Sequence, residues 1–562
     1  MRMRLLPGVL AVLAAGCGAS GGEYGSAAGD AGPGYGADAG AVGCLSSNEC
    51  QNGYVCSEFG RCERMPTSTD GGTDAPPPPE IEYEFSAPIS SDRYVYVAMT
   101  SEDELARIDG ETLAVHATPV GKSPKLVSAI PNTDGAVVLD SVNGTATIVR
   151  PAGQTDTTKV LATLKNLNRL DVDPSGRYAV AWFDLTKQIQ SGGIGGVGSF
   201  QDVTVIALAP GLERGVDLTV GFRPREVQFD AAGAHAYVIT QDGVSVVDLG
   251  YATTHGPTIV PPIPVSDPMF PPEAVEVHVV STGTYAAVRN LGESSLHVVD
   301  VGGPQLGHSW TIPLASAATD IDLAPNGARI YAVEREAKKL AIIDIPGDAL
   351  DPNGVETIDL TGASIGSLVL SRDGNRGLLF TNATTDERLT MVQLDAPGYP
   401  FVTWPLKKSV RAVGISPTGT TAIVLHAKAF GDPNTAANVD EFIDRSYGYS
   451  LVDLASGFAK LQITPVDPGA FVYAPDGTKA YIALDGGDAP TAVRALQVVT
   501  TGTGVVTTKQ LGSPPTAVGI LPGAGMSFTS QRHPLGRVSF VNLLTDAVRT
   551  VTGFDLNGNI VN

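Results

Sequence analysis

Cysteine is scarce in this chain of 562 residues, and all five cysteines lie within the first 62 positions. The rest of the chain therefore offers no thiol that could act as a nucleophile. Its eight histidines are scattered and form no H-x-x-x-H or H-E-x-x-H pair, and no serine lies in a G-x-S-x-G turn. Since no catalytic constellation is recognisable, the sequence favours a non-enzymatic role and leaves activity open.

Basic residues are also few. Lysine and arginine total 37 against 59 aspartates and glutamates, which gives a net charge of −22 at neutral pH. A surface of this charge repels phosphate backbones, so we expect no nucleic-acid partner. The charge alone does not indicate a cationic ligand. We expect no cofactor, with a divalent metal as the open alternative.

The apolar run near the N-terminus is short. It covers 5–15, eleven residues after Arg2 and Arg4, and is too short to span a bilayer as a stable anchor. Its composition predicts a targeting segment at 1–16. The string LAAGC ending at Cys17 resembles a bacterial lipobox, although Ala14 stands where that pattern prefers leucine.

The lipobox resemblance implies cleavage before Cys17 and lipidation of its thiol. Gly18 follows, without the aspartate that would retain the protein at the inner membrane. We therefore expect a lipid-anchored protein of the cell envelope, at the outer membrane or cell surface, with its N-terminal lipid as the membrane contact. The alternative is an ordinary secretory leader with a chance cysteine.

The other four cysteines, Cys44, Cys50, Cys56 and Cys62, are evenly spaced as C-x5-C-x5-C-x5-C. An even set in a short exported segment predicts two disulfides, for which three connectivities are open. A four-thiolate zinc site is the alternative, although its ligands usually come as closer pairs. The module at 44–64 resembles small Cys-rich modules of exported bacterial proteins. A flexible tether at 17–43 precedes it, and a Pro-rich linker at 65–84 follows.

A short phrase recurs ten times between residues 88 and 525: an apolar run, a tight turn usually ending in glycine, and a second apolar run. Clear copies read LDVDPSGRYAVAW around Gly176, IDLAPNGARIYAV around Gly327 and FVYAPDGTKAYIAL around Gly477. Successive glycines from Gly135 onward are 41 to 58 residues apart. Short alternating strands repeated at this period predict propeller blades, because one blade cannot bury both of its faces alone.

These repeats resemble the YVTN/lactonase-like β-propeller repeats of bacterial surface proteins, which are also WD40-like in their period. The best copies are at 120–149 and 474–484, and the resemblance covers about 85–555. It implies a propeller fold and leaves function open. We predict an all-β chain with one large propeller of about eight to ten four-stranded blades at 85–562. The alternative is two rings of five, and we expect a monomer.

In a propeller the innermost strand of each blade begins at the mouth of a central channel, so its first residues meet there. A candidate ligand site at this mouth comprises Lys125, Arg169, Arg225, Glu226, Glu273, Asp320 and Arg411. The alternative is that these residues form a solvated ring or pair with one another. Long insertions at 186–200 and 427–447, together with SDPMFPPE at 266–273, are expected on the same face.

Two functions remain open from the sequence. The first is a surface protein that binds a protein or a glycan through the insertion-bearing face. The second is a lactonase-like or other hydrolase that uses charged groups at the channel mouth, for which no nucleophile can be named.

Overall fold

The computed structural model describes a large part of the chain, including nearly all of the repeat region. The described ranges are 54–56, 62–64, 89–153, 155–187, 200–267, 270–487, 489 and 491–554. The leader, Cys17 and both linkers lie outside these residues. Within the described residues, no helix is long and apolar enough to cross a membrane.

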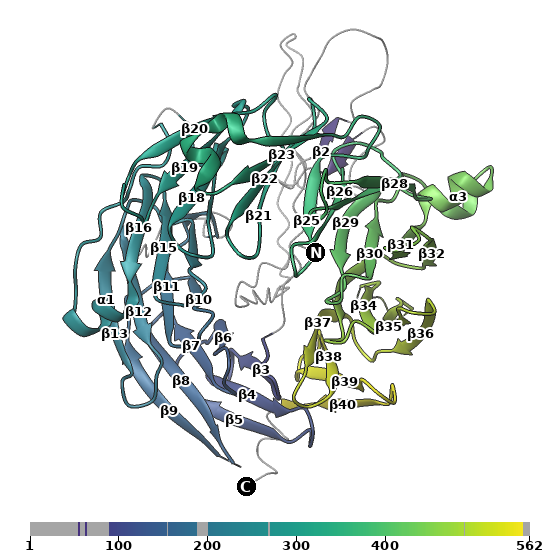
Figure 1. Ribbon diagram of the computed structural model, residues 1–562. Coiled ribbons are helices and arrows are strands. Elements are labelled where there is room, and N and C mark those ends of the chain that lie inside the picture. Colours follow the sequence, from purple (N-terminus) through teal and green to yellow (C-terminus); the bar gives the residue numbers. More distant parts are fainter. Residues whose placement is uncertain are drawn as a thin grey trace, which may run out of the picture. The chain divides into compact units, whose positions relative to one another are not determined.

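Ten antiparallel sheets form the ten blades of a single ring (Figure 1). Each blade is a meander in which consecutive strands pair side by side, and the first strand of a complete blade lies innermost. Blade 1 contains β3 (Tyr94–Met99), β4 (Glu104–Asp109) and β5 (Val115–Pro119), and blade 2 contains β6 (Leu126–Ala129), β7 (Ala136–Asp140), β8 (Thr145–Ala152) and β9 (Thr155–Ala162). Blade 3 contains β10 (Arg169–Val172), β11 (Tyr178–Trp182), β12 (Asp202–Ala207) and β13 (Arg214–Thr219), and blade 4 contains β14 (Glu226–Phe229), β15 (His235–Thr240) and β16 (Gly243–Asp248). Blade 5 contains β17 (Val275–Val279), β18 (Tyr285–Asn290), β19 (Ser295–Asp300) and β20 (Ser309–Pro313).

The second half of the ring repeats the same plan. Blade 6 contains β21 (Asp320–Leu323), β22 (Arg329–Glu334), β23 (Lys339–Asp344) and β24 (Glu356–Asp359), and blade 7 contains β25 (Ser367–Leu370), β26 (Arg376–Phe380), β27 (Arg388–Gln393) and β28 (Phe401–Pro405). Blade 8 contains β29 (Val410–Ile415), β30 (Thr421–His426), β31 (Tyr447–Asp453) and β32 (Ala459–Thr464), and blade 9 contains β33 (Pro468–Tyr473), β34 (Lys479–Asp485), β35 (Arg494–Thr500) and β36 (Val505–Gln510). Blade 10 contains β37 (Pro515–Leu521), β38 (Met526–Gln531), β39 (Arg537–Asn542) and β40 (Val548–Thr552). The prediction of one large propeller is confirmed.

Helices occur only in connections within the described residues. They are α1 (Leu249–His255), α2 (Gly347–Leu350) and α3 (Val439–Arg445), with 3₁₀ turns η2 (Leu185–Lys187), η4 (Pro272–Ala274), η5 (Pro352–Gly354) and η6 (Pro433–Thr435).

The second strand of a blade shows why these sequences stack. All five residues of β7 are buried. Its side chains point alternately to opposite faces, so Ala136 and Val138 pack toward blade 1 while Val137 and Leu139 pack toward blade 3. Because both faces are covered, the first four residues of the strand form an uninterrupted apolar run, which Asp140 ends.

Ten hydrophobic clusters fill the ten interfaces between neighbouring blades. Blades 5 and 6 share one of them, built around Leu296 and Ile330, so nothing divides the ring into two halves. The alternative of two five-bladed rings is therefore wrong. Each blade is stabilised mainly by its two neighbours, as in other repeat architectures.

The glycine of the recurring phrase has a steric role at the clearest copies. Gly176 adopts φ +72°, and a Cβ at this position would lie 2.2 Å from the carbonyl oxygen of Pro131 in the preceding blade. The turn of one blade thus sits directly on the turn of its neighbour, and only glycine allows both the backbone conformation and the contact.

Two blades depart from the four-stranded plan. In blade 1 the innermost strand is reduced to a single bridge between Ser90 and Val95. In blade 4 the fourth strand is missing, and helix α1 follows β16 instead. The next segment bonds Val260 N to Thr219 O of blade 3 (2.8 Å) and then Ile263 N to Val244 O of blade 4 (2.9 Å). It therefore joins the outer parts of two neighbouring blades.

The ring closes between blades 10 and 1 without a shared sheet. All strands of blade 10 come from the end of the propeller sequence and all strands of blade 1 from its beginning. The closing cluster includes Val95, Ile108, Phe528, Phe540 and Phe554. One backbone bond accompanies it, from Gly523 N to Asp92 O at 2.9 Å.

Residues 13–78 belong to a second unit, of which only two short strands are described. It contains a two-stranded hairpin of β1 (Tyr54–Cys56) and β2 (Cys62–Arg64), in whose register Cys56 is opposite Cys62. Cys44 and Cys50 lie outside the described residues, and the predicted disulfides remain a prediction.

Candidate functional site

The seven residues predicted at the channel mouth do lie at the beginnings of inner strands. Arg169, Glu226 and Asp320 are the first residues of β10, β14 and β21, and Arg411 is the second residue of β29. Lys125 and Arg225 immediately precede β6 and β14, and Glu273 lies in η4 before β17. Their common placement follows from the meander order of each blade.

Most of these residues hold neighbouring parts of the ring together. Arg169 forms an ion pair with Asp184 of its own blade, with Nη2 and Oδ2 3.0 Å apart. Arg411 reaches into blade 9, where its Nη1 lies 2.8 Å from Oδ2 of Asp467 and its Nη2 donates to Pro468 O at 2.8 Å. Asp320 accepts a hydrogen bond from the backbone N of Leu368 in blade 7.

The structure brings only part of the set together. Arg225 interacts electrostatically with Glu273, Glu226 and Asp184, whereas burial lowers the pKa of its guanidinium. Its Nη1 contacts Val275 O of blade 5 at 3.5 Å. Blades 3 to 5 therefore carry a mixed-charge group, while Lys125, Asp320 and Arg411 belong to other blades.

The candidate site predicted from the sequence does not include Asp171. Asp171 lies inside β10, is 7 % exposed, and accepts a hydrogen bond of 2.6 Å from Nε1 of Trp182. Burial raises the pKa of this carboxyl to about 6, and the charges of Glu226 and Asp184 add to the effect. The signal in the sequence for this buried carboxyl was Trp182, whose indole N–H needs an acceptor when it is buried. In the register of the hairpin, Trp182 is opposite Arg169, two residues before Asp171. Asp173, by contrast, caps its turn, since it accepts from Ser175 N.

Asp171 gives a pH prediction. Its pKa rises from 3.8 to about 6 on folding, so the folded state binds the proton more tightly and loses stability as pH rises from about 4 to 7. The shift corresponds to about 3 kcal/mol. We expect Asp171→Asn to remove this loss. In denaturant titrations, the free energy of unfolding of the variant should therefore rise relative to that of the wild type by about 3 kcal/mol between pH 4 and 7.

Asp359 provides a control of opposite sign. The hydroxyl and backbone N–H of Thr361 lower the pKa of its carboxyl. Its contribution is present above the unfolded pKa and lost as pH falls, so Asp359→Asn should cost stability at neutral pH. A stability difference between Asp171→Asn and wild type that stays constant with pH would contradict the assignment.

The described residues contain no group of three His, Cys, Asp or Glu side chains arranged to hold a metal ion. The histidines that occur in strands have structural partners. His278 Nε2 lies 2.6 Å from Glu276 Oε1, and His426, buried in β30, contacts Ser450 Oγ at 2.7 Å. Burial lowers the pKa of His426 to about 4, so this imidazole is neutral at physiological pH.

The 427–447 insertion is an ordered structural element. It leaves blade 8 between β30 and β31 and contains η6 and helix α3, which projects from the ring in Figure 1. Strand order places it at the same edge as the inner-strand beginnings, as predicted. Asn438 caps the helix by accepting from Glu441 N at 2.8 Å.

A buried lysine attaches this insertion to the propeller. Lys408 is 1 % exposed, and its Nζ donates to Ile443 O at 2.6 Å and to Asp444 O at 2.8 Å. A cation at the carbonyl end of a helix is favourable because of the helix dipole. Ala429 N also donates to Asp444 O at 2.8 Å, which ties the beginning of the insertion to the end of α3.

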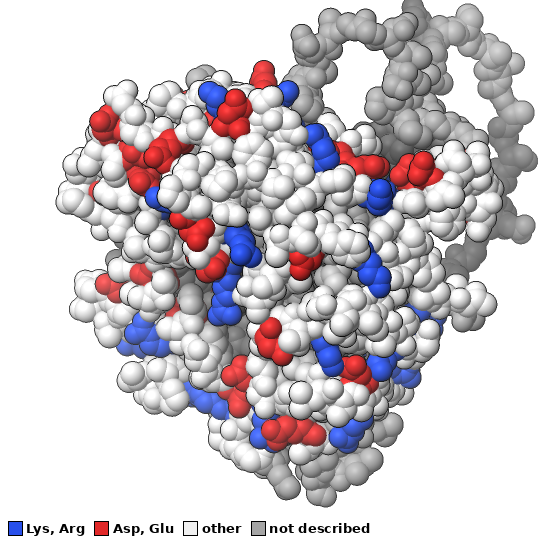
Figure 2. Space-filling view, turned by 45° about the vertical axis from the view of Figure 1, so that its right-hand side comes forward, with Lys and Arg blue, Asp and Glu red and all other residues white. Residues whose placement is uncertain are grey.

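The other two predicted loops are described only in part. Residues 188–199 of the 186–200 insertion lie outside the described residues, and so do 268 and 269 of the segment 266–273. The site is therefore built on the 427–447 insertion. Acidic and basic side chains are interspersed over the side of the molecule shown in Figure 2.

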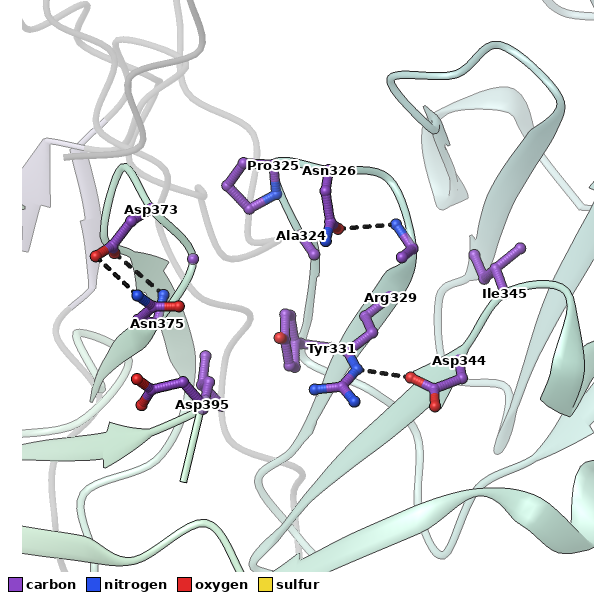
Figure 3. A pocket seen from close by; sticks show the side chains of 13 residues that line it. Ala324, Pro325, Asn326, Arg329, Tyr331, Asp344, Ile345, Asp373, Asn375 and Asp395 are labelled. Carbon is purple, nitrogen blue, oxygen red and sulfur yellow. Dashed lines mark hydrogen bonds and ion pairs between the residues drawn. The ribbon is translucent and has the colours of Figure 1, made fainter. Parts of the chain in front are cut away.

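A pocket of about 610 Å³ lies between the turns of blades 6 and 7 (Figure 3). Strand order places these turns at the edge opposite the 427–447 insertion. Arg329 Nε contacts Asp344 Oδ1 at 2.6 Å on one side, and Asp373 Oδ2 accepts from Asn375 Nδ2 at 3.0 Å on the other. Tyr331 lies between these pairs, and its burial raises the pKa of the phenol. The Arg329–Asp344 pair stabilises the pocket wall in blade 6, and the Asp373–Asn375 hydrogen bond stabilises the turn in blade 7.

Comparison with known proteins gives similarity to solved structures only. No protein-family model matches the sequence, and no curated protein does. The chain is similar to a eukaryotic initiation factor (12% identity over 76% of this chain and 95% of that one, TM-score 0.46). It is also similar to the dihydro-heme d1 dehydrogenase NirN (12%, 65% and 74%, TM-score 0.39) and to apo AztD from Citrobacter koseri (13%, 68% and 95%, TM-score 0.36). These similarities do not bear on the function of this chain.

Proposed function

We propose that this protein is a lipid-anchored β-propeller of the bacterial cell envelope that binds a protein or a glycan through the face bearing the 427–447 insertion. One observation carries the proposal: the insertion is fixed by buried Lys408, yet it exposes large apolar side chains. Phe430 is 72 % exposed and Val439 is 71 % exposed. Contiguous exposed apolar side chains are typical of interaction surfaces, and Val439 is three residues from Phe442 on α3.

Site-specific photo-crosslinking tests the binding face. A benzophenone amino acid replaces Val439 in the full chain, expressed in its own cells, and the same amino acid replaces Phe458 as a control. Phe458 is 69 % exposed but lies in the turn between β31 and β32, at the opposite edge of the same blade. We expect a defined adduct from position 439 alone, or specific binding on a glycan array. Identical adducts from both positions together with an empty array would refute the binding face.

The anchor has a separate test. Growth with an alkyne-labelled fatty acid should label the wild-type protein and leave Cys17→Ser unlabelled. The absence of label in the wild type would favour an ordinary secretory leader.

A hydrolase remains the second candidate because of Asp171. A carboxyl that titrates near pH 6 is suited to general acid or base catalysis, and Arg169 and Glu226 lie close enough to interact with it electrostatically. Lactone hydrolysis by the purified protein, lost in Glu226→Ala or Glu273→Ala, would support this function. A metal-free protein that is inert toward lactones would eliminate it.

A further inference from the structure

The exposed side chains of the insertion define the chemistry of its partner. Val439 and Phe442 are three residues apart on α3, so they lie on one face of the helix. Phe442 is 40 % exposed. Phe430 lies near the C-terminal end of α3, which ends at Arg445. A Cβ added to its neighbour Gly431 would be 2.8 Å from Nε of Arg445.

These side chains have no hydrogen-bonding atoms. A sugar requires donors and acceptors around its hydroxyl groups, and a buried hydroxyl without a partner is costly. Nearby Tyr447 is engaged within the protein, since the Lys428 ammonium lies 5.1 Å from its ring centroid. Valine and two phenylalanines instead match an apolar groove on a protein, into which such side chains insert as anchors.

The charges around the apolar side chains are mainly negative. Segment 427–447 contains four acidic and two basic residues, a net charge of −2. Both cations are occupied, since Arg445 pairs with Glu441 and Lys428 Nζ donates to Gly431 O at 3.2 Å. Asp432 and Asp440 are exposed. A partner with lysine or arginine at the rim of its groove would complement this surface.

The insertion is also preorganised. The Asn438 cap, the Glu441–Arg445 pair and the two bonds from Lys408 hold α3 before any partner arrives. Binding therefore costs little conformational entropy on this side of the interface.

We infer that the 427–447 insertion docks into an apolar groove of a partner protein, rimmed by lysine or arginine, with Phe430, Val439 and Phe442 as anchors. This inference rests on the proposed binding function. Of the two partners proposed there, a protein or a glycan, it selects a protein with an apolar groove and a basic rim.

The probe is a designed helical hairpin with a leucine-lined groove, made in two versions with lysine or glutamate along the rim. Each version is titrated against the full chain and followed by fluorescence anisotropy. We expect one binding site for the lysine version and at least tenfold weaker binding of the glutamate version. Phe430→Ser and Phe442→Ser should each weaken the lysine version at least tenfold, whereas Phe458→Ser should leave it unchanged.

Equal affinity for the two versions, or equal losses from Phe430→Ser and Phe458→Ser, would overturn the inference. A glycan that binds the wild type and both phenylalanine variants equally would leave the proposed binding function standing while refuting the protein groove. Raising the salt concentration should weaken binding of the lysine version, and binding insensitive to salt would refute the charged rim.

Discussion

Replacing Asp156 by alanine is expected to destabilise the propeller by about 3–5 kcal/mol, because the change leaves a buried arginine without its counter-ion. Asp156 in β9 of blade 2 faces Arg107 in β4 of blade 1, with Oδ1 and Nε 2.8 Å apart. Their side chains are 1 % and 5 % exposed. Thr118 Oγ1 donates to the second carboxylate oxygen at 2.7 Å, and the Arg107 guanidinium lies 4.5 Å from the ring centroid of Tyr94.

Denaturant titration of the full chain measures this loss. The matched control replaces both partners with leucine, because an apolar pair of similar volume leaves no buried charge and is often neutral or stabilising. The Asp156→Ala variant should therefore be markedly less stable than the double variant. If the two are equally stable, the ion pair does not hold these blades together.

The second large effect is expected at the ring closure. Phe540 is completely buried between blades 10 and 1, and Phe540→Ala should cost about 3–5 kcal/mol through lost burial and the cavity that remains. Phe471→Ala is the matched control, since Phe471 is 2 % exposed in the interface between blades 8 and 9. There the chain runs directly from one blade into the next.

The two variants should differ in where the ring loosens. Hydrogen exchange is expected to accelerate in blades 1 and 10 for Phe540→Ala, including at the Gly523 amide that bonds to Asp92 O. For Phe471→Ala it should accelerate around blades 8 and 9. Acceleration spread evenly over the ring in both variants would show that the closing interface is no weaker point than the others.

The propeller and a range of about eight to ten blades could be predicted because each blade has a recognisable local sequence pattern. The phrase around Gly176 contains an apolar run, a turn and a second run, and all three are decided by neighbouring residues. The missing strand of blade 4 was not predicted, although its cause is also local. Asp248 accepts a hydrogen bond from Tyr251 N and starts α1, and the four prolines between 257 and 264 cannot donate to a ladder.

The candidate site was less accessible to sequence reasoning. The beginnings of the inner strands follow from the meander, so the positions of Arg169 and Arg411 on their strands could be inferred from the sequence. Their role in binding a ligand stays a prediction. Their partners Asp184 and Asp467 depend on the distance between separate segments, which no local pattern contains. The buried position of Lys408 was equally hidden, because an isolated lysine before a strand normally indicates a solvated turn.

The way this ring closes also bears on how it is made. Nine of the ten interfaces join blades that follow one another in the chain, so each can form as soon as the next blade emerges from the ribosome. Only the closing interface requires contact between segments about four hundred residues apart. Before the last blade is synthesised, the first presents the apolar side chains of Val95 and Ile108 to water, and the growing chain is exposed to mispairing at that surface.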